Sequence, residues 1–384
     1  MGNLPGFTLG IFFNMNYPLR PLLIVFAFSL IIPGIFGFIL YQYISNQPPK
    51  EEIKNAVEII GAARKIEANT YAKANFDFAE KALNLAMKEW NIQNEKLFFV
   101  RDYSLVKAEA NNAIRYGNEA YTEATYEKDS LSIALHNQLK KVQFQLAKFE
   151  KKFKNLPLSN ETFNAYAKAK ISYSEANIQF SKKQFYAAKQ SIKEAEHDIS
   201  GALSKAISKL NQFYNDYPIW QKNAKKAKEL SMNGQYVILV NKLEATCTLL
   251  KAGKQVAQFN TEFGTNWLGD KRLMGDNATP EGIYKVVKKK KGGNTNYYKS
   301  LLLNYPNEED KKNFAQAIKN GSIPKHSKIG ELIQIHGLGG KGLNWTEGCV
   351  ALNNEDMEKL YNLVQINTPV IIIGADITLS EYLK

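Results

Sequence analysis

A long stretch without helix breakers does most to limit how this chain can fold. Residues 51–156 contain no proline and only two glycines, Gly61 and Gly117. Proline and glycine are the residues that most destabilise the interior of a helix, so their scarcity favours long helices. Pro157 then predicts a break before a second helical block, which extends to about Pro218.

The helical region contains a degenerate internal repeat. Residues 71–80 match residues 166–175, and a second pair of matching segments begins at Asp102 and Gln184. Each copy reads as a helical hairpin, and stacking two hairpins would bury their shared apolar faces. We predict a module of antiparallel helical hairpins over residues 51–231, which serves either as a spacer or as a binding module.

The pattern changes to short alternating apolar runs from about residue 235, and such runs favour β-strands. The predicted strands are residues 236–240, 246–250, 255–259, 282–287, 329–336 and 369–374. Residues 308–320 read as a helix among these strands. The fold class predicted for the chain is therefore α+β and multidomain, with a mainly β domain at residues 232–384.

An apolar run near the start of the sequence predicts a membrane segment. No charged residue occurs between Arg20 and Lys50. Within that window, residues 22–44 exceed the ~20 apolar residues needed to cross a bilayer. A cleaved signal peptide is the alternative, but its apolar region covers only ~7–15 residues and precedes a small-residue cleavage site. We therefore expect an uncleaved transmembrane helix at residues 22–44, after a cytoplasmic segment at residues 1–21.

Charge and cysteine usage narrow the classes of partner. Lys and Arg number 50 against 37 Asp and Glu, and the excess is spread along the chain. Because no aromatic-studded basic patch exists, we expect no nucleic-acid partner, and diffuse positive charge suits an anionic cell envelope. The run of four lysines and two glycines at residues 288–293 reads as a solvated hairpin tip. Cys247 and Cys349 are expected to be free, and no Cys/His spacing predicts a metal site or a cofactor.

His336 and Cys349 are the candidate chemical groups. His336 ends an alternating run at residues 331–336, which predicts a strand that carries the ring to the edge of a pocket. Cys349 follows Gly348, whose missing side chain lets backbone N–H groups approach a developing oxyanion. A nearby imidazole, together with a helix that begins close after the thiol, would favour the reactive thiolate.

These residues resemble the catalytic signature of the L,D-transpeptidase (YkuD-type) family. That signature is a strand ending in His-Gly, then Ser/Thr-x-Gly-Cys and an apolar residue. Here it reads His336-Gly337, then Thr-Glu-Gly-Cys-Val at residues 346–350. Residues 275–286 resemble the family's Thr-Pro-x-Gly-x-Tyr/Phe strand. The resemblance covers roughly residues 232–384 and implies a mainly β catalytic domain.

Two positions depart from the family pattern. Many members carry His where Glu347 stands, and Arg where Ala351 stands. In the family, that arginine helps to hold the donor peptide. The Thr-x-Gly-Cys-Val-Ala form resembles a divergent branch that includes enzymes hydrolysing links to peptidoglycan. Transfer and hydrolysis therefore both stay open for this chain.

The resemblance implies a two-step acyl transfer on peptidoglycan stem peptides. Cys349 attacks the carbonyl of the third stem residue and expels the terminal D-amino acid, while His336 takes the thiol proton and returns one to the leaving amine. An amine or water then resolves the thioester, which gives a transpeptidase, or a carboxypeptidase or amidase of the same fold.

The remaining site residues have supporting roles in this reading. Backbone N–H groups at Gly348 and Glu347 would stabilise the oxyanion. The carbonyl of Gly337 would orient the imidazole, and Thr346 and Trp345 would shape the wall of the cleft.

The same reading predicts where the protein works and what it contacts. We expect a single-pass protein of the bacterial cytoplasmic membrane, with its catalytic domain on the periplasmic or extracytoplasmic side, where peptidoglycan lies. An envelope protein or a glycan is the expected partner if the helical module binds one. A non-catalytic envelope-binding scaffold that uses the helical repeats is the alternative from another class.

Overall fold

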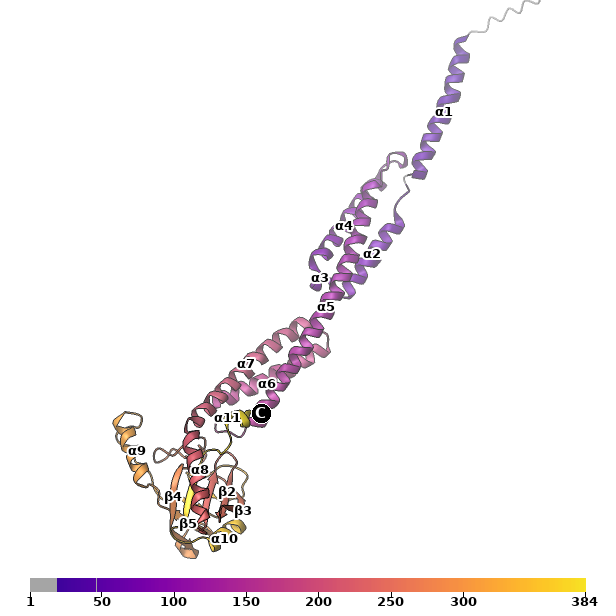
Figure 1. Ribbon diagram of the computed structural model, residues 1–384. Coiled ribbons are helices and arrows are strands. Elements are labelled where there is room, and N and C mark those ends of the chain that lie inside the picture. The colour runs from indigo at the N-terminus through magenta and orange to yellow at the C-terminus, as the bar shows by residue number, and fades with distance from the viewer. Residues whose placement is uncertain (1–18, 46) are drawn as a thin grey trace, which may run out of the picture. The chain divides into compact units, whose positions relative to one another are not determined.

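The computed structural model describes residues 19–45 and 47–384, with the side chains of its first helix described for residues 29–44. The chain divides into two compact units, Met1–Ala134 and Leu135–Lys384, which are described separately below. The long helix α5 (Ser104–Lys152) begins in the first unit and ends in the second (Figure 1).

Helix α1 (Leu19–Ser45) contains the sequence that was expected to cross a membrane. Among the residues that the structure describes, none of the helices combines the length and the apolar character needed to cross a bilayer. The described side chains of α1 begin at Ser29 and so cover fewer than the ~20 residues that a span requires. The transmembrane helix of the predicted fold class is therefore wrong, and residues 1–18 of the predicted cytoplasmic segment lie outside the described residues.

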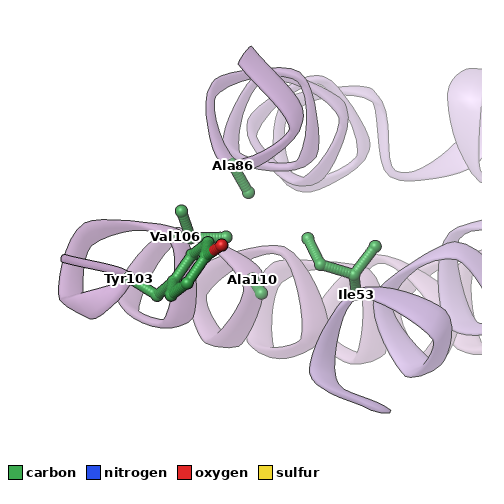
Figure 2. Packing of buried hydrophobic residues seen from close by; sticks show 5 residues of the cluster. All are labelled: Ile53, Ala86, Tyr103, Val106 and Ala110. Atoms are coloured by element: carbon green, nitrogen blue, oxygen red, sulfur yellow. The ribbon is translucent and has the colours of Figure 1, made fainter. Parts of the chain in front are cut away.

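The first unit is helical. Its helices before α5 are α2 (Lys50–Lys65), α3 (Ala68–Tyr71), α4 (Lys73–Glu95) and the short η1 (Phe98–Val100). Ile53 of α2 and Ala86 of α4 pack against Tyr103, Val106 and Ala110 at the beginning of α5 (Figure 2). Alanine at two of these positions lets the helix backbones approach closely, so the core needs few large side chains.

A second helical pair opens the other unit after the end of α5. It consists of α6 (Asn160–Ser181) and α7 (Phe185–Phe213), which pack against each other. The short η2 (Tyr214–Asp216) and α8 (Tyr217–Met232) follow. Pro218 lies in the first turn of α8, where a missing N–H costs nothing, so this proline begins a helix instead of ending one.

The second pair of matching segments in the repeat coincides with the beginnings of helices. Asp102 stands shortly before α5 and Gln184 is the residue before α7, so each of these matching segments opens a helix. Tyr103 and Phe185, the aromatic residues that follow, are both buried. The two copies thus share a way of anchoring the start of a long helix.

An eight-stranded sheet forms the C-terminal part of the second unit, in the order β3-β2-β1-β8-β4-β5-β6-β7. The strands are β1 (Val237–Asn241), β2 (Thr246–Lys251), β3 (Lys254–Asn260), β4 (Gly282–Lys291), β5 (Lys299–Leu303), β6 (Gln334–His336), β7 (Val350–Ala351) and β8 (Pro369–Ile373). The short η3 (Gly292–Asn294) and the helices α9 (Glu308–Lys319), α10 (Asn354–Leu363) and α11 (Leu379–Leu383) connect or follow them. The last four residues of β8 are all buried, as expected for a central strand.

Helix α8 packs against the middle of this sheet. Trp220 is almost fully buried, and its indole N–H donates to Glu281 Oε2 at 2.6 Å. A Cβ atom on Gly374, just after β8, would lie only 2.2 Å from the Trp220 ring. Glycine is therefore required at this position for the helix to lie on the sheet.

The sheet differs from the predicted one in two places that matter for the site. Only the last three residues of the strand predicted at residues 329–336 form β6. Leu332 has φ +63°, which interrupts the extended backbone before them. Of the hairpin tip predicted at residues 288–293, the four lysines lie within β4, and only the two glycines belong to η3, which forms the tip. Neither β5 nor β7 was predicted.

Candidate active site

His336 ends β6 in the interior of the sheet and is fully buried. Its Nδ1 lies 2.6 Å from the carbonyl oxygen of Gly337. A carbonyl can only accept, so Nδ1 carries the proton and Nε2 has the free lone pair. Nε2 is buried and has no hydrogen-bond partner among the described residues. The imidazole is thus held in the tautomer that a general base needs.

Two aromatic rings enclose the imidazole. The Tyr297 ring stacks on it with centroids 3.6 Å apart and planes inclined by 12°, and Trp345 approaches with its edge at 5.9 Å. Burial lowers the pKa of His336 to about 4; the Gly337 hydrogen bond opposes this shift, and the Lys341 charge adds to it. The ring is therefore neutral at neutral pH.

Cys349 lies on the same face of the sheet as His336. The parallel pairing of β6 with β7 sets His336 opposite Ala351, and Cys349 precedes Ala351 by two residues. Side chains two residues apart along an extended chain point to the same face. The predicted thiol and imidazole thus lie on one side of the sheet, with no hydrogen bond between them.

The thiol is neutral in this arrangement. Cys349 is half-buried, and its thiol donates a weak hydrogen bond to the Leu332 carbonyl at 3.8 Å. Burial raises the pKa of the Cys349 thiol, although the nearby Lys271 charge opposes the shift. Helix α10 does begin shortly afterwards, with Asn353 as its N-cap, but burial outweighs it. The expected resting thiolate is replaced by a neutral thiol beside a neutral base.

A short turn holds the nucleophile. The Thr346 hydroxyl accepts from the Gly348 N–H at 3.2 Å and donates to the Cys349 carbonyl at 2.8 Å. The Gly348 N–H, one of the predicted oxyanion donors, is thus occupied within the turn. The N–H groups of Glu347 and Cys349 have no acceptor among the described residues. These two groups are the available donors for an oxyanion.

Gly348 is needed for steric reasons as well. Its φ is +128°, and a Cβ atom would lie 2.5 Å from the Ala278 carbonyl oxygen. Ala278 belongs to the segment that contains the Thr-Pro-Glu-Gly motif, so the two sequence motifs meet at this point. Glycine provides the close approach and not only an accessible N–H.

An open cleft of about 830 Å³ lies in front of the thiol. Trp345, Thr346, Glu347 and Cys349 line it, together with residues 293–297 and 330–334. The cleft is also lined by Lys271, Met274, Gly275 and Lys290. It is mixed in charge, because two lysines and the carboxylates of Glu331 and Glu347 line it, and it is large enough for a peptide.

Two acidic residues that the sequence did not single out hold the loops of the site. Glu262 is buried, and its carboxylate accepts from Gly342 N at 2.6 Å and from Trp345 Nε1 at 2.7 Å. Asp276 accepts from three backbone N–H groups of its own turn and from Lys271 Nζ at 2.8 Å. Their partners lie mostly in loops, so no periodic pattern signals them.

The described part of the chain lacks the side-chain clusters that bind metal ions. No group of three or more His, Cys, Asp or Glu side chains is placed there to hold an ion. Cys247 is buried in β2, and burial raises the pKa of its thiol to about 12. Cys349 is therefore the more accessible of the two cysteines.

A thiol and a neutral imidazole on one side of a sheet, beside an open cleft, are the groups that acyl transfer through a cysteine requires. The sequence match agrees: residues 235–372 match the family model of the L,D-transpeptidase catalytic domain (YkuD). The C-terminal part of this chain is thus similar to L,D-transpeptidase catalytic domains.

Among curated proteins, the chain is similar to YafK of Escherichia coli strain K12, which is named as a candidate L,D-transpeptidase. The two are 26% identical over 155 residues, which cover 39% of this chain and 54% of YafK. YafK of Escherichia coli O157:H7 matches with the same values. The chain spans about half the length of the curated relatives it matches.

Solved structures match the same part of the chain. Bd1075 of Bdellovibrio bacteriovorus is 23% identical, with 39% of this chain and 52% of that chain covered and a TM-score of 0.29. An L,D-transpeptidase of Xylanimonas cellulosilytica is 14% identical, with 36% and 61% covered and a TM-score of 0.26.

Proposed function

We propose that the C-terminal domain transfers an acyl group from a peptidoglycan stem peptide through a thioester on Cys349. The observation that carries this proposal is the buried Nε2 of His336, which has a free lone pair on the sheet face that bears the thiol. The family of residues 235–372 supports the substrate class. We place the activity outside the cytoplasmic membrane, where peptidoglycan is found.

The chemistry begins from the neutral pair. His336 Nε2 takes the thiol proton as the sulfur of Cys349 bonds to the carbonyl carbon of the third stem residue. The N–H groups of Glu347 and Cys349 donate to the oxyanion. When the C–N bond breaks, the imidazolium returns its proton to the leaving D-amino acid, and the acyl group stays on sulfur.

The second step decides between two reactions of one site. An amine of another stem peptide that attacks the thioester gives a cross-link, with His336 taking the proton from the amine. Water in the same place gives hydrolysis. One observation favours the hydrolytic alternative: Ala351 is fully buried, so the position that carries arginine in many family members supplies no group to hold a peptide.

The test incubates the full chain with a disaccharide-tetrapeptide and follows the products by mass spectrometry. We expect loss of the terminal D-amino acid and a covalent adduct on Cys349. Cross-linked dimers identify transfer, and tripeptide without dimers identifies hydrolysis. Cys349→Ala should abolish both, while the matched Cys247→Ala variant should retain them. If the wild-type chain forms no adduct and no product, acyl transfer is excluded and the scaffold alternative gains.

A further inference from the structure

The lysine run in β4 sends its side chains to two different faces of the sheet. Lys289 Nζ donates to the carbonyls of Tyr361 at 2.5 Å and Val364 at 2.7 Å, at the end of α10. Neighbouring residues of a strand point to opposite faces. Lys290 accordingly lies on the other face, where it lines the cleft in front of Cys349.

Strand register places Lys290 in one row with the catalytic imidazole. Lys290 pairs with Ser300 of β5, Ser300 pairs with His336 of β6, and His336 pairs with Ala351 of β7. Directly opposed residues share a face of the sheet. Ser300 is small and buried, so it places no bulk between Lys290 and His336. Beyond His336 the row ends in Ala351, which carries no charge.

The ammonium group of Lys290 has no counterion. Among residues 19–45 and 47–384, no hydrogen-bond or ion-pair partner of Lys290 occurs, although its side chain is half-buried. The other lysine of the cleft, Lys271, is paired with Asp276 at 2.8 Å. Neither Glu331 nor Glu347 forms an ion pair with Lys290. A partly desolvated cation of this kind favours an anionic ligand.

We propose that Lys290 binds a carboxylate of the peptide that occupies the cleft. This inference rests on the proposed function, because the donor of that reaction carries such groups. Three strand spacings, about 14 Å, separate the backbones of β4 and β7. With its side chain extended towards the thiol, Lys290 reaches a carboxylate within about two residues of the bond that is cleaved.

The carboxylate has two sources in a stem peptide: the terminal D-amino acid, and the side chain of the third residue where that residue is a diamino diacid. Both present the same chemistry to an ammonium group. Ala351 offers no cation on the far side of His336, so the anionic group is held on the β4 side of the cleft. The lysine would thereby set the direction in which the peptide lies across the sheet.

The first experiment compares three variants of the full chain. Lys290→Met removes the charge, Lys290→Arg keeps it, and Lys288→Met removes an exposed lysine from the same strand. We expect Lys290→Met to raise KM for the tetrapeptide donor roughly tenfold or more with little change in kcat. Lys290→Arg should recover most of the loss, and Lys288→Met should behave as wild type.

Modified donors locate the bound group. The loss caused by Lys290→Met should disappear with a donor whose terminal carboxylate is amidated, or else with a donor whose third residue is lysine. Either result supports the proposal and identifies the source. An equal loss on all three donors, or no loss on any, overturns it.

A binding measurement separates this proposal from the proposed function. Cys349→Ala and the double variant Cys349→Ala/Lys290→Met are titrated with tetrapeptide by calorimetry, which needs no turnover. Roughly tenfold weaker binding to the double variant supports the carboxylate site even if the wild-type chain proves inactive. Equal affinity overturns it even if the wild-type chain turns over.

Discussion

The helical pair α6–α7 and the sheet that follows it differ in how exposed their ion pairs are. The ion pair Lys205–Glu161 joins the two helices with both side chains largely exposed, at 46% and 76%. In the sheet, Lys242 and Glu281 pair at 2.7 Å with 0% and 7% of their side chains exposed. A helix satisfies its own backbone groups, whereas the loops of the sheet leave carbonyls and N–H groups that need side-chain partners.

The buried ammonium group of Lys242 supplies hydrogen bonds to carbonyl groups in such loops. Its Nζ donates to the carbonyls of Gly269 at 2.5 Å and Thr279 at 2.9 Å, and also to Glu281. These acceptors lie in the segment that reaches β4 through the Thr-Pro-Glu-Gly motif. In the sheet, the stability of the fold and the geometry of the site therefore depend on the same buried groups.

The largest expected effect is the loss of the buried lysine. Lys242→Met removes the counterion of the buried Glu281 and should lower the free energy of unfolding by about 3–5 kcal/mol. Hydrogen exchange of peptides from β1 and β8 in increasing urea measures it. Lys205→Met, its exposed counterpart, should cost at most about 1 kcal/mol. Equal costs for the two variants would remove the contrast between the regions.

The helical pair should instead be sensitive to volume. Ala195 of α7 is fully buried, whereas Ala187 on the same helix is exposed. Ala195→Leu forces extra methyl groups into the packed interface and should destabilise α6–α7 by about 1–3 kcal/mol. Exchange rates of α7 peptides report the change, with Ala187→Leu as the matched control. Tolerance of leucine at both positions would mean that the alanines do not set the helix spacing.

A smaller effect should follow from neutralising Glu262. The amide of Glu262→Gln offers one acceptor oxygen, so either Gly342 N–H or Trp345 Nε1 loses its partner. The displaced Trp345 should lower kcat roughly tenfold, because small shifts near a reacting pair are costly. Steady-state kinetics test this beside Glu308→Gln, a change at an exposed residue of α9. Unchanged kcat would show that the loop keeps its place without the carboxylate.

The smallest effect concerns pH. Since burial lowers the pKa of His336 to about 4, kcat/KM should fall by less than about twofold from pH 7 to pH 5.5. An imidazole at the ordinary value of ~6.5 would lose about tenfold over that range. The acid limb of the pH–rate profile provides the measurement, and a limb near pH 6.5 would contradict the buried environment.

The same shift links pH to stability. Below about pH 6.5 the unfolded chain binds a proton at this histidine that the folded domain does not accept. The free energy of unfolding should therefore decrease as the pH is lowered from about 6.5 to about 4. Above that window this group should have no effect on stability. His336→Gln should flatten this part of the stability profile.

Local patterns predicted the elements that are regular in sequence. The break at Pro157, the strands β1 to β3 and the helix α9 all follow from periodicity and turn residues. The pattern was misleading where residues 22–44 predicted a transmembrane helix. It was incomplete at β5 and β7, because a two-residue strand such as β7 has no period to detect.

The sequence by itself predicted His336 and Cys349 as the chemical pair, because both stand in short motifs with fixed spacing. Only the tertiary structure decided their state: burial makes both groups neutral, and Tyr297, distant in the chain, stacks on the imidazole. It also assigned different roles to adjacent lysines, since Lys289 meets α10 and Lys290 meets the cleft. Motifs report neighbours along the chain, whereas charge state and direction depend on what the sheet packs around each side chain.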